Sequence, residues 1–201
     1  MSATVFVTAI LSSMLINNII LTRFLGVCPF LGVSNRIEKA MGMSVAVIFV
    51  MVIASAVTYL LYYYVLAPLE ISYISTIAFI LIIASLVQLV EMVIKKVSKK
   101  LYKGLGIYLP LITTNCAILG VVELNINAGF NAEYGMWNGF FVAVTTAFGA
   151  GLGFALILFA FSSIRERLEH APVPESWKGI PVSLVVAAIM ALAFIGLGGI
   201  A

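Results

Sequence analysis

The chain holds two cysteines, and the same short motif follows each of them. The motif reads CPFLGV from Cys28 and CAILGV from Cys116, so both copies have the form C-x-x-L-G-V. Thiolates bind zinc and iron–sulfur clusters, but these centres take four ligands. The single histidine, His170, lies in a charged loop and is expected at a different depth from the cysteines. Two cysteines therefore predict at most half of a metal site, with a second chain supplying the other two thiolates.

The cysteines could also have a purely structural role. Free cysteine often behaves as a small buried hydrophobe, and both residues could simply pack in the interior. A disulfide is less favoured, because nothing places Cys28 and Cys116 on the oxidising side of a membrane. Ligation is favoured by the shared motif and by nearby glycines, which let backbone N–H groups approach a cluster with a formal charge of about −2. These glycines are Gly26, Gly32 and Gly120.

The composition identifies the environment of these residues. Hydrophobic residues make up 63% of the 201 residues and charged residues 9%, against about 45–50% and about 25% in soluble globular proteins. A water-facing surface cannot be built from so few charges, so the sequence predicts an all-α integral membrane protein. The chain has no Walker loop, no G-x-G-x-x-G motif and no polar segment long enough for a flavin or nicotinamide domain. No nucleic-acid partner is expected.

Six segments are free of charge and long enough, or nearly so, to cross a bilayer as helices of about 20 residues. They are residues 1–22, 40–69, 71–90, 104–122, 134–164 and 179–201. None shows the alternation of a membrane β-strand. The fifth segment carries three glycines that predict close packing against another helix: Gly149, Gly151 and Gly153.

The basic residues predict the orientation of the six helices. All eleven Lys and Arg fall in the first, third and fifth loops, while the second and fourth loops hold none. The positive-inside rule therefore places these three loops in the cytoplasm and both termini outside, as expected for a protein of the prokaryotic inner membrane. Arg23 either ends the first span at the cytoplasmic face or lines a cavity. The three clusters are Arg23, Arg36 and Lys39; Lys95, Lys96, Lys99, Lys100 and Lys103; and Arg165, Arg167 and Lys178.

Two matched motifs predict an internal repeat. The cysteine motifs are 88 residues apart, and GMSVAV from Gly42 is echoed by GFFVAV from Gly139, 97 residues later. We therefore expect one membrane domain built from two three-helix repeats, 1–97 and 98–201. An odd number of helices per repeat inverts the second repeat relative to the first, and such folds place function near the midplane at discontinuous helices.

The first and fourth helices are expected to be discontinuous, and the cysteines to lie at the breaks. After Arg23, the apolar residues 24–33 are too few to span a bilayer alone. In the fourth helix, Pro110 removes a backbone donor, and the polar residues 113–115 directly precede Cys116. Non-helical backbone at this depth needs cover from protein or a cavity.

Other polar residues have a structural and a functional interpretation. Glu91 lies four residues before Lys95, which favours a helix-surface ion pair, although a carboxylate in a membrane could also line an ion path. The amides and hydroxyls near the breaks could satisfy freed backbone groups or could bind an ion. They are Asn17, Asn18, Thr113, Thr114 and Asn115. Of these, Thr114 and Asn115 are the candidates for an ion path.

These motifs resemble a known family. Asn17-Asn18, FLGVCPFLGVS at 24–34, LPLITTNCAILGV at 109–121 and Arg165-Glu166-Arg167 are similar to the RnfA-type subunits of the Rnf complexes. The resemblance covers essentially the whole chain and extends to the related E-type membrane component of the sodium-pumping NADH:quinone oxidoreductases. The Cys-Pro-Phe and Thr-Thr-Asn-Cys forms favour the Rnf protein over its sister.

The resemblance implies a role in electron transport. It implies a non-autonomous subunit of a translocase that couples electron transfer between ferredoxin and NAD to movement of Na⁺ or H⁺. It also implies that Cys28 and Cys116 join two cysteines of a homologous six-helix subunit, of the RnfE type, around an intramembrane [2Fe–2S] cluster. Flavin and further Fe–S centres would lie in other Rnf subunits. The alternative is an inverted-repeat secondary transporter or channel with structural cysteines.

Overall fold

The computed structural model describes residues 3–68, 74–97, 109–170, 172, 174 and 177–198, and these residues form helices without strands. The elements, in chain order, are α1 (Ala3–Leu11), η1 (Ser12–Ile16), α2 (Val27–Val33), α3 (Ile37–Leu61), η2 (Tyr62–Leu66), α4 (Ser75–Val97), α6 (Leu109–Thr113), α7 (Cys116–Asn127), α8 (Phe130–Tyr134), α9 (Met136–Glu169) and α10 (Ile180–Gly198). The prediction of an all-helical protein is confirmed.

Three helical segments of the described chain are long and apolar enough to cross a membrane. They are Ile37–Leu66, Ser75–Met92 and Met136–Glu169. Two shorter apolar helices, Thr4–Ile16 and Ile180–Gly196, accompany them. The chain is therefore a multi-pass membrane protein.

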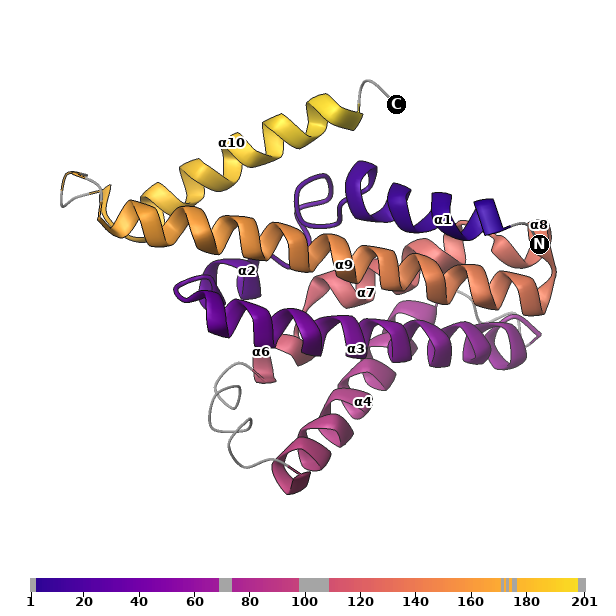
Figure 1. Ribbon diagram of the computed structural model, residues 1–201. Coiled ribbons are helices and arrows are strands. Elements are labelled where there is room, and N and C mark those ends of the chain that lie inside the picture. Colours follow the sequence, from indigo (N-terminus) through magenta and orange to yellow (C-terminus); the bar gives the residue numbers. More distant parts are fainter. Residues whose placement is uncertain are drawn as a thin grey trace.

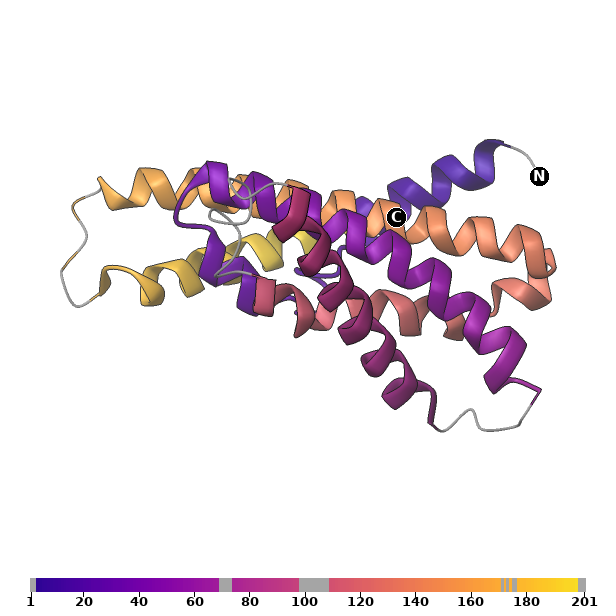
Figure 2. The same ribbon diagram turned by 90° about the horizontal axis from the view of Figure 1, so that it is seen from below.

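The long helices α3 and α9 run antiparallel through the centre of the molecule (Figure 1). Helices α4 and α10 lie on opposite sides of this pair and slant away from it (Figures 1 and 2). A glycine brings the central pair together, because a β-carbon at Gly151 would lie 3.0 Å from Cγ1 of Ile48 on α3. The absence of a side chain at Gly151 thus permits the close approach of the two backbones.

The first helix packs against glycines on another side of α9. A β-carbon at Gly149 would collide with Oγ of Ser13, and one at Gly153 would lie 2.7 Å from the carbonyl oxygen of Met14 and 2.9 Å from Nδ2 of Asn18. The predicted close packing of these glycines is confirmed. Because Gly153 lies halfway along the 34-residue α9, the end of η1 is held at the middle of the bundle.

The helices break at both predicted positions. The first helix ends at Ile16, and the chain passes through turns, with φ of 56° at Phe24 and 82° at Gly26, before α2 begins. The second break separates α6 from α7 by two residues, Thr114 and Asn115. The first break therefore contains a long turn region, whereas the second contains only an extended cap.

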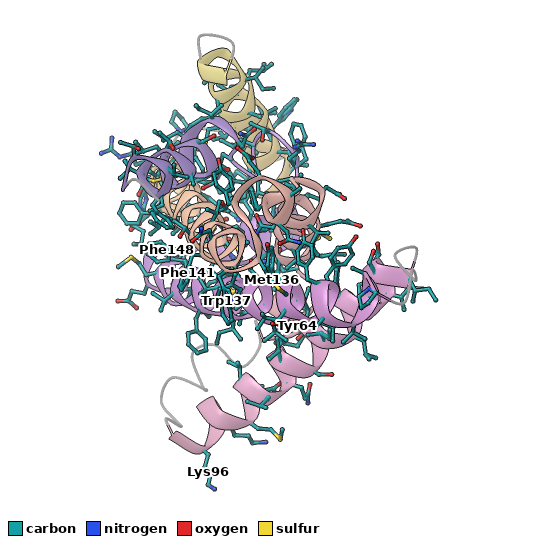
Figure 3. The ribbon with its side chains drawn as sticks, turned by 90° about the vertical axis from the view of Figure 1, so that its right-hand side faces the viewer. Tyr64, Lys96, Met136, Trp137, Phe141 and Phe148 are labelled. Carbon is teal, nitrogen blue, oxygen red and sulfur yellow. The ribbon has the colours of Figure 1, made fainter. Side chains whose placement is uncertain are left out.

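The two ends of the molecule differ in their side chains. Figure 3 looks onto the end where α9 begins, and Tyr64, Met136 and Trp137 lie there. Tyr64 and Trp137 are exposed, which is typical of the aromatic belt at a membrane interface. The opposite end carries the start of α3 and the end of α9 (Figure 1), with the described basic residues Arg36, Lys39, Arg165 and Arg167.

Some predicted features lie outside the described residues. The boundary between repeats at residues 97 and 98 adjoins the undescribed range 98–108, which also contains the start of the predicted fourth span. The charged loop residues in undescribed ranges are Glu70, Lys99, Lys100, Lys103 and Glu175. The six-span count and the repeat boundary stay predictions.

Candidate functional site

Cys28 is the second residue of the short helix α2, which starts directly after Gly26. Helix α2 has only seven residues, too few for a stable helix on its own, so tertiary packing must hold it. Phe30 provides part of that packing, because its buried ring stacks on Phe161 of α9 with the centroids 4.1 Å apart. The backbone at Cys28 is thereby fixed against the central helix pair.

Arg165 of α9 holds the other end of α2. Its Nη1 donates hydrogen bonds to the carbonyl oxygen of Leu31, at 2.8 Å, and to Oγ of Ser34, at 2.9 Å. Oγ of Ser162 donates to the carbonyl oxygen of Ser34, at 3.1 Å. These bonds satisfy carbonyls that the last turn of a helix leaves without intrahelical partners, and the positive charge suits a helix C-terminus.

Cys116 is the first residue of α7, and the residues before it form the cap of that helix. Oδ1 of Asn115 accepts a hydrogen bond from the backbone N–H of Ala117, at 3.0 Å. The hydroxyl of Thr114 donates to the carbonyl oxygen of Pro110, at 3.0 Å, and the Cys116 thiol lies 3.8 Å from the carbonyl oxygen of Thr114. Asn115 therefore acts as the N-cap of α7, and Cys116 is the first residue of the helix.

The two cysteine-bearing segments pack against each other. A β-carbon at Gly26 would lie 3.0 Å from Cβ of Ala117 and 3.1 Å from Oδ1 of Asn115. On the far side of α2, a β-carbon at Gly32 would lie 3.6 Å from Leu111 of α6. Residues on both sides of Cys28 thus contact residues on both sides of Cys116, although 88 positions separate the cysteines in the sequence.

Both thiols are exposed in this chain. Cys28 and Cys116 therefore do not pack in the interior of this chain, because the packing that buries Asn115 and Ala117 leaves the cysteines at its surface. Among the described residues, no group of three or more His, Cys, Asp or Glu could hold a metal ion. The chemistry of the donor set fits half of a four-thiolate centre.

The amides at the breaks satisfy backbone groups. Asn18 accepts a hydrogen bond from the N–H of Ile20, at 3.2 Å, and donates through Nδ2 to the carbonyl oxygen of Met14, at 3.0 Å. Asn115 accepts from the backbone in the same way, but its buried Nδ2 has no hydrogen-bond partner within the part of the chain that the structure describes. The structural role expected for these amides is present, and the ion-path role of Thr114 and Asn115 stays a prediction.

The third ion-path candidate, Glu91, lies on α4 four residues before Lys95. Its place in an ion path also stays a prediction. A different carboxylate, Glu123, makes a contact between helices, because its Oε1 accepts a hydrogen bond from the hydroxyl of Thr76, at 2.8 Å. This bond joins α7 to α4, and no sequence signal marks a pair that lies 47 residues apart.

A cavity of about 510 Å³ lies between the first helix and α7, α8 and α9. Arg23 lines it, together with Asn17 of the first break and Asn125 of α7. The Arg23 side chain is exposed on this lining. Its lining includes Val142, Thr146 and Ala150 of α9. It also includes Tyr134 of α8, which lies just before α9 begins.

Comparison with known proteins identifies the family of the chain. Residues 6–201 match the family model of the Rnf-Nqr subunit, which is described as a membrane protein. The chain belongs to the Rnf-Nqr family. This membership confirms the resemblance that the two cysteine motifs indicate.

Individual relatives in the Rnf-Nqr family match the chain over nearly its whole length. A protein of Acetobacterium woodii, named as the A component of a Na(+)-translocating ferredoxin:NAD(+) oxidoreductase complex, is 54% identical over 94% of each chain. Proteins named as the A component of an ion-translocating oxidoreductase complex are 50% identical in Syntrophotalea carbinolica, over 95% of each chain, and 49% identical in Hahella chejuensis, over 98% of each chain. These relatives are subunits of complexes and not complete enzymes.

Proposed function

We propose that this chain is a membrane subunit of an ion-translocating ferredoxin:NAD oxidoreductase complex, in which Cys28 and Cys116 supply half the ligands of a shared [2Fe–2S] cluster. The names of its full-length relatives support the complex. The contact of Gly26 with Asn115 and Ala117, beside two exposed thiols, is the observation that supports the half-site. The other two thiolates would come from a homologous six-helix subunit.

The residues around the cysteines would hold the ligands in place. The contact at Gly26 sets the spacing of the two backbones, and Arg165 fixes the far end of the Cys28 helix. The buried Nδ2 of Asn115, which has no acceptor among the described residues, is an unused donor close to the ligand segments. When bound, a [2Fe–2S] cluster supplies one-electron transfer, and hydrogen bonds and burial set its reduction potential.

The proposal includes six spans and an orientation. The short segments α1–η1 and α2 would form one discontinuous span, and α6 and α7 another, which would complete two inverted three-helix repeats with α3–α4 and α9–α10. The described basic residues Arg36, Lys39, Arg165 and Arg167 lie at the end where α9 finishes, which supports a cytoplasmic position for that end. Both termini would then lie outside.

The nicotinamide, ferredoxin and flavin chemistry would belong to other subunits of the complex. The A. woodii relative is named for Na⁺, ferredoxin and NAD⁺, and by analogy this chain would contribute to the membrane path for electrons and for Na⁺ or H⁺. Lipid would cover the outer faces of α4 and α10, which carry exposed apolar residues such as Ile77, Leu81, Ile189 and Leu192.

Iron and acid-labile sulfide assays on the purified complex test the half-site. Cys28→Ser and Cys116→Ser should each remove two irons and two sulfides per complex, if assembly is retained. Gly196→Ala on α10 is the control, because it lies outside the cysteine segments and an added β-carbon there meets nothing within 4 Å. Its iron and sulfide content should equal that of the wild type.

The alternative, a transporter or channel with structural cysteines, gives the opposite result. Both serine variants would then keep the full iron and sulfide content, and electron transfer would be unchanged. That outcome would remove the cluster from the account and leave the family membership and the fold.

A further inference from the structure

A smaller pocket, of about 150 Å³, lies between the end of α9 and the start of α10. Its charged lining residues are Arg165 and Glu169 of α9 and Lys178, which precedes α10. Helix α9 has 34 residues and is therefore about 50 Å long, whereas the hydrocarbon core of a bilayer is about 30 Å thick. Because the exposed Trp137 at the start of α9 marks one interface, the end of α9 reaches the lipid headgroups of the other leaflet.

The guanidinium of Arg165 is fixed in the wall of this pocket. Its Nη1 donates to the carbonyl oxygen of Leu31 at 2.8 Å and to Oγ of Ser34 at 2.9 Å, so its position is set by α2. Within the described part of the chain, its Nε and Nη2 make no hydrogen bond. These N–H groups are left for a ligand of the pocket, and an oriented guanidinium suits the oxygens of a phosphate.

Lys178 and Glu169 add one charge of each sign. Both are exposed, and neither makes an ion pair with another described residue. The Lys178 ammonium is therefore available as a second cation for a phosphate, as in the basic pockets between membrane helices that bind lipid headgroups. Glu169 lies four residues after Arg165, on the same face of α9 and about 6 Å nearer to the end of the helix. Its carboxylate attracts an ammonium group and repels a second anion.

The apolar part of the pocket continues toward the centre of the bilayer. Leu168 of α9 and Val182 of α10 line the pocket. About one turn deeper on the same helix faces, Ile164 and Val185 are exposed. From the bilayer centre outward, the surface therefore presents apolar side chains, then a guanidinium, then a carboxylate. A phospholipid with an amine in its headgroup has the complementary order of acyl chain, phosphate and ammonium.

We propose that the pocket between α9 and α10 binds a phospholipid of the phosphatidylethanolamine type. The phosphate lies between Arg165 and Lys178, the ammonium lies beside Glu169, and an acyl chain follows Leu168 and Val182 into the bilayer. Phosphatidylglycerol fits less well, because its headgroup carries no cation for Glu169. This assignment goes beyond the proposed function and does not depend on the cluster.

Photocrosslinking in nanodiscs tests the assignment. The purified complex is placed in bilayers of equal phosphatidylethanolamine and phosphatidylglycerol, with a photoreactive acyl chain on one lipid or the other, and mass spectrometry measures the yield on residues 164–185. The wild type should crosslink phosphatidylethanolamine in preference to phosphatidylglycerol. Lys178→Gln should lower the yield with phosphatidylethanolamine about fivefold, because it removes a cation at the membrane surface. Glu169→Gln should abolish or reverse the preference between the two lipids. Arg167→Gln, which removes an exposed arginine outside the pocket, is the matched control and should match the wild type.

The possible results separate this proposal from the half-site. Equal yields of the two lipids on the wild type, or a preference for phosphatidylglycerol, would overturn it. A yield that Lys178→Gln leaves unchanged would also overturn it, and so would loss of the crosslink in millimolar inorganic phosphate, which would identify a site for free phosphate. Cys28→Ser complexes that assemble should crosslink as the wild type does, so failure of the cluster proposal would leave these results unchanged.

Discussion

Gly26 and Asn115 lie so close that a β-carbon on Gly26 would stand 3.1 Å from Oδ1 of Asn115. The contact joins the turn that precedes the Cys28 helix to the cap that precedes the Cys116 helix. Gly26 also has φ of 82°, a left-handed conformation that glycine adopts without strain. One residue thus meets two requirements, the turn and the close approach, and both determine where the cysteines lie.

Gly26→Ala should destabilise the protein and lower its iron content. The left-handed conformation costs about 1–2 kcal/mol for a residue with a β-carbon, and overpacking against Asn115 and Ala117 adds about 1–3 kcal/mol. Gly129→Ala is the control, since Gly129 has φ of 65° but no atom within 4 Å of the added carbon. Thermal unfolding of the purified complex should therefore show a larger loss for Gly26→Ala. Equal losses would mean that the contact with the Cys116 segment has no energetic weight.

Arg165→Gln should loosen the C-terminal end of α2. It removes charged hydrogen bonds to Leu31 and Ser34, and bonds to charged groups contribute about 1.5–3 kcal/mol each. The expected result is a lower denaturation midpoint and partial loss of iron from the complex. Arg167→Gln, two residues away and exposed, should change neither quantity. The interpretation of Arg165 as a positioning residue fails if the two variants behave alike.

Asn125 and Ser55 should be energetically coupled. Asn125 of α7 bonds both to Ser55 of α3 and to the carbonyl oxygen of Ala143 of α9, so three helices meet at one amide. Asn125→Leu should cost about 1–3 kcal/mol, because it leaves buried polar groups without their partner. In a double-mutant cycle with Ser55→Ala, the expected coupling energy is about 0.5–3 kcal/mol. Additive losses would contradict a direct interaction.

Gly153→Ala should push the first helix away from α9. The added carbon would lie 2.7 Å from the backbone oxygen of Met14, which cannot move as easily as a side chain. The variant is expected to lose about 1–3 kcal/mol of stability. Gly196→Ala on α10 meets nothing within 4 Å and should gain up to about 1 kcal/mol from helix propensity. Unfolding midpoints of the two variants should therefore shift in opposite directions, and a gain for Gly153→Ala would contradict the packing.

The features that the sequence predicts correctly are those encoded locally. Apolar composition predicts the membrane helices, and the glycines of α9 predict close packing, since a missing side chain is itself the cause of the contact. Pro110, with the polar residues that follow it, marks the second break. The start of α7 at Cys116 has a local cause as well, because Asn115 before it is a strong N-cap residue.

The features that the sequence does not predict depend on tertiary structure. Hydropathy cannot distinguish a loop at the membrane surface from a turn within the bundle, so the sequence leaves both positions open for Arg23. The bonds of Arg165 to α2 span more than 130 residues and follow no local pattern. The exposure of the cysteines is likewise not encoded locally, since cysteine is among the most buried residue types in proteins.

Low-temperature EPR of the reduced, purified complex tests the central claim most directly. The account predicts that a [2Fe–2S] signal of the wild type is lost or altered in both Cys28→Ser and Cys116→Ser and is unchanged in Gly196→Ala, in complexes that still assemble. Loss of the same signal from both serine variants would establish that the two segments joined by Gly26 and Asn115 bind one cluster. An unchanged spectrum in either variant would contradict the account, because a shared centre cannot keep its signal after one of its ligands is replaced.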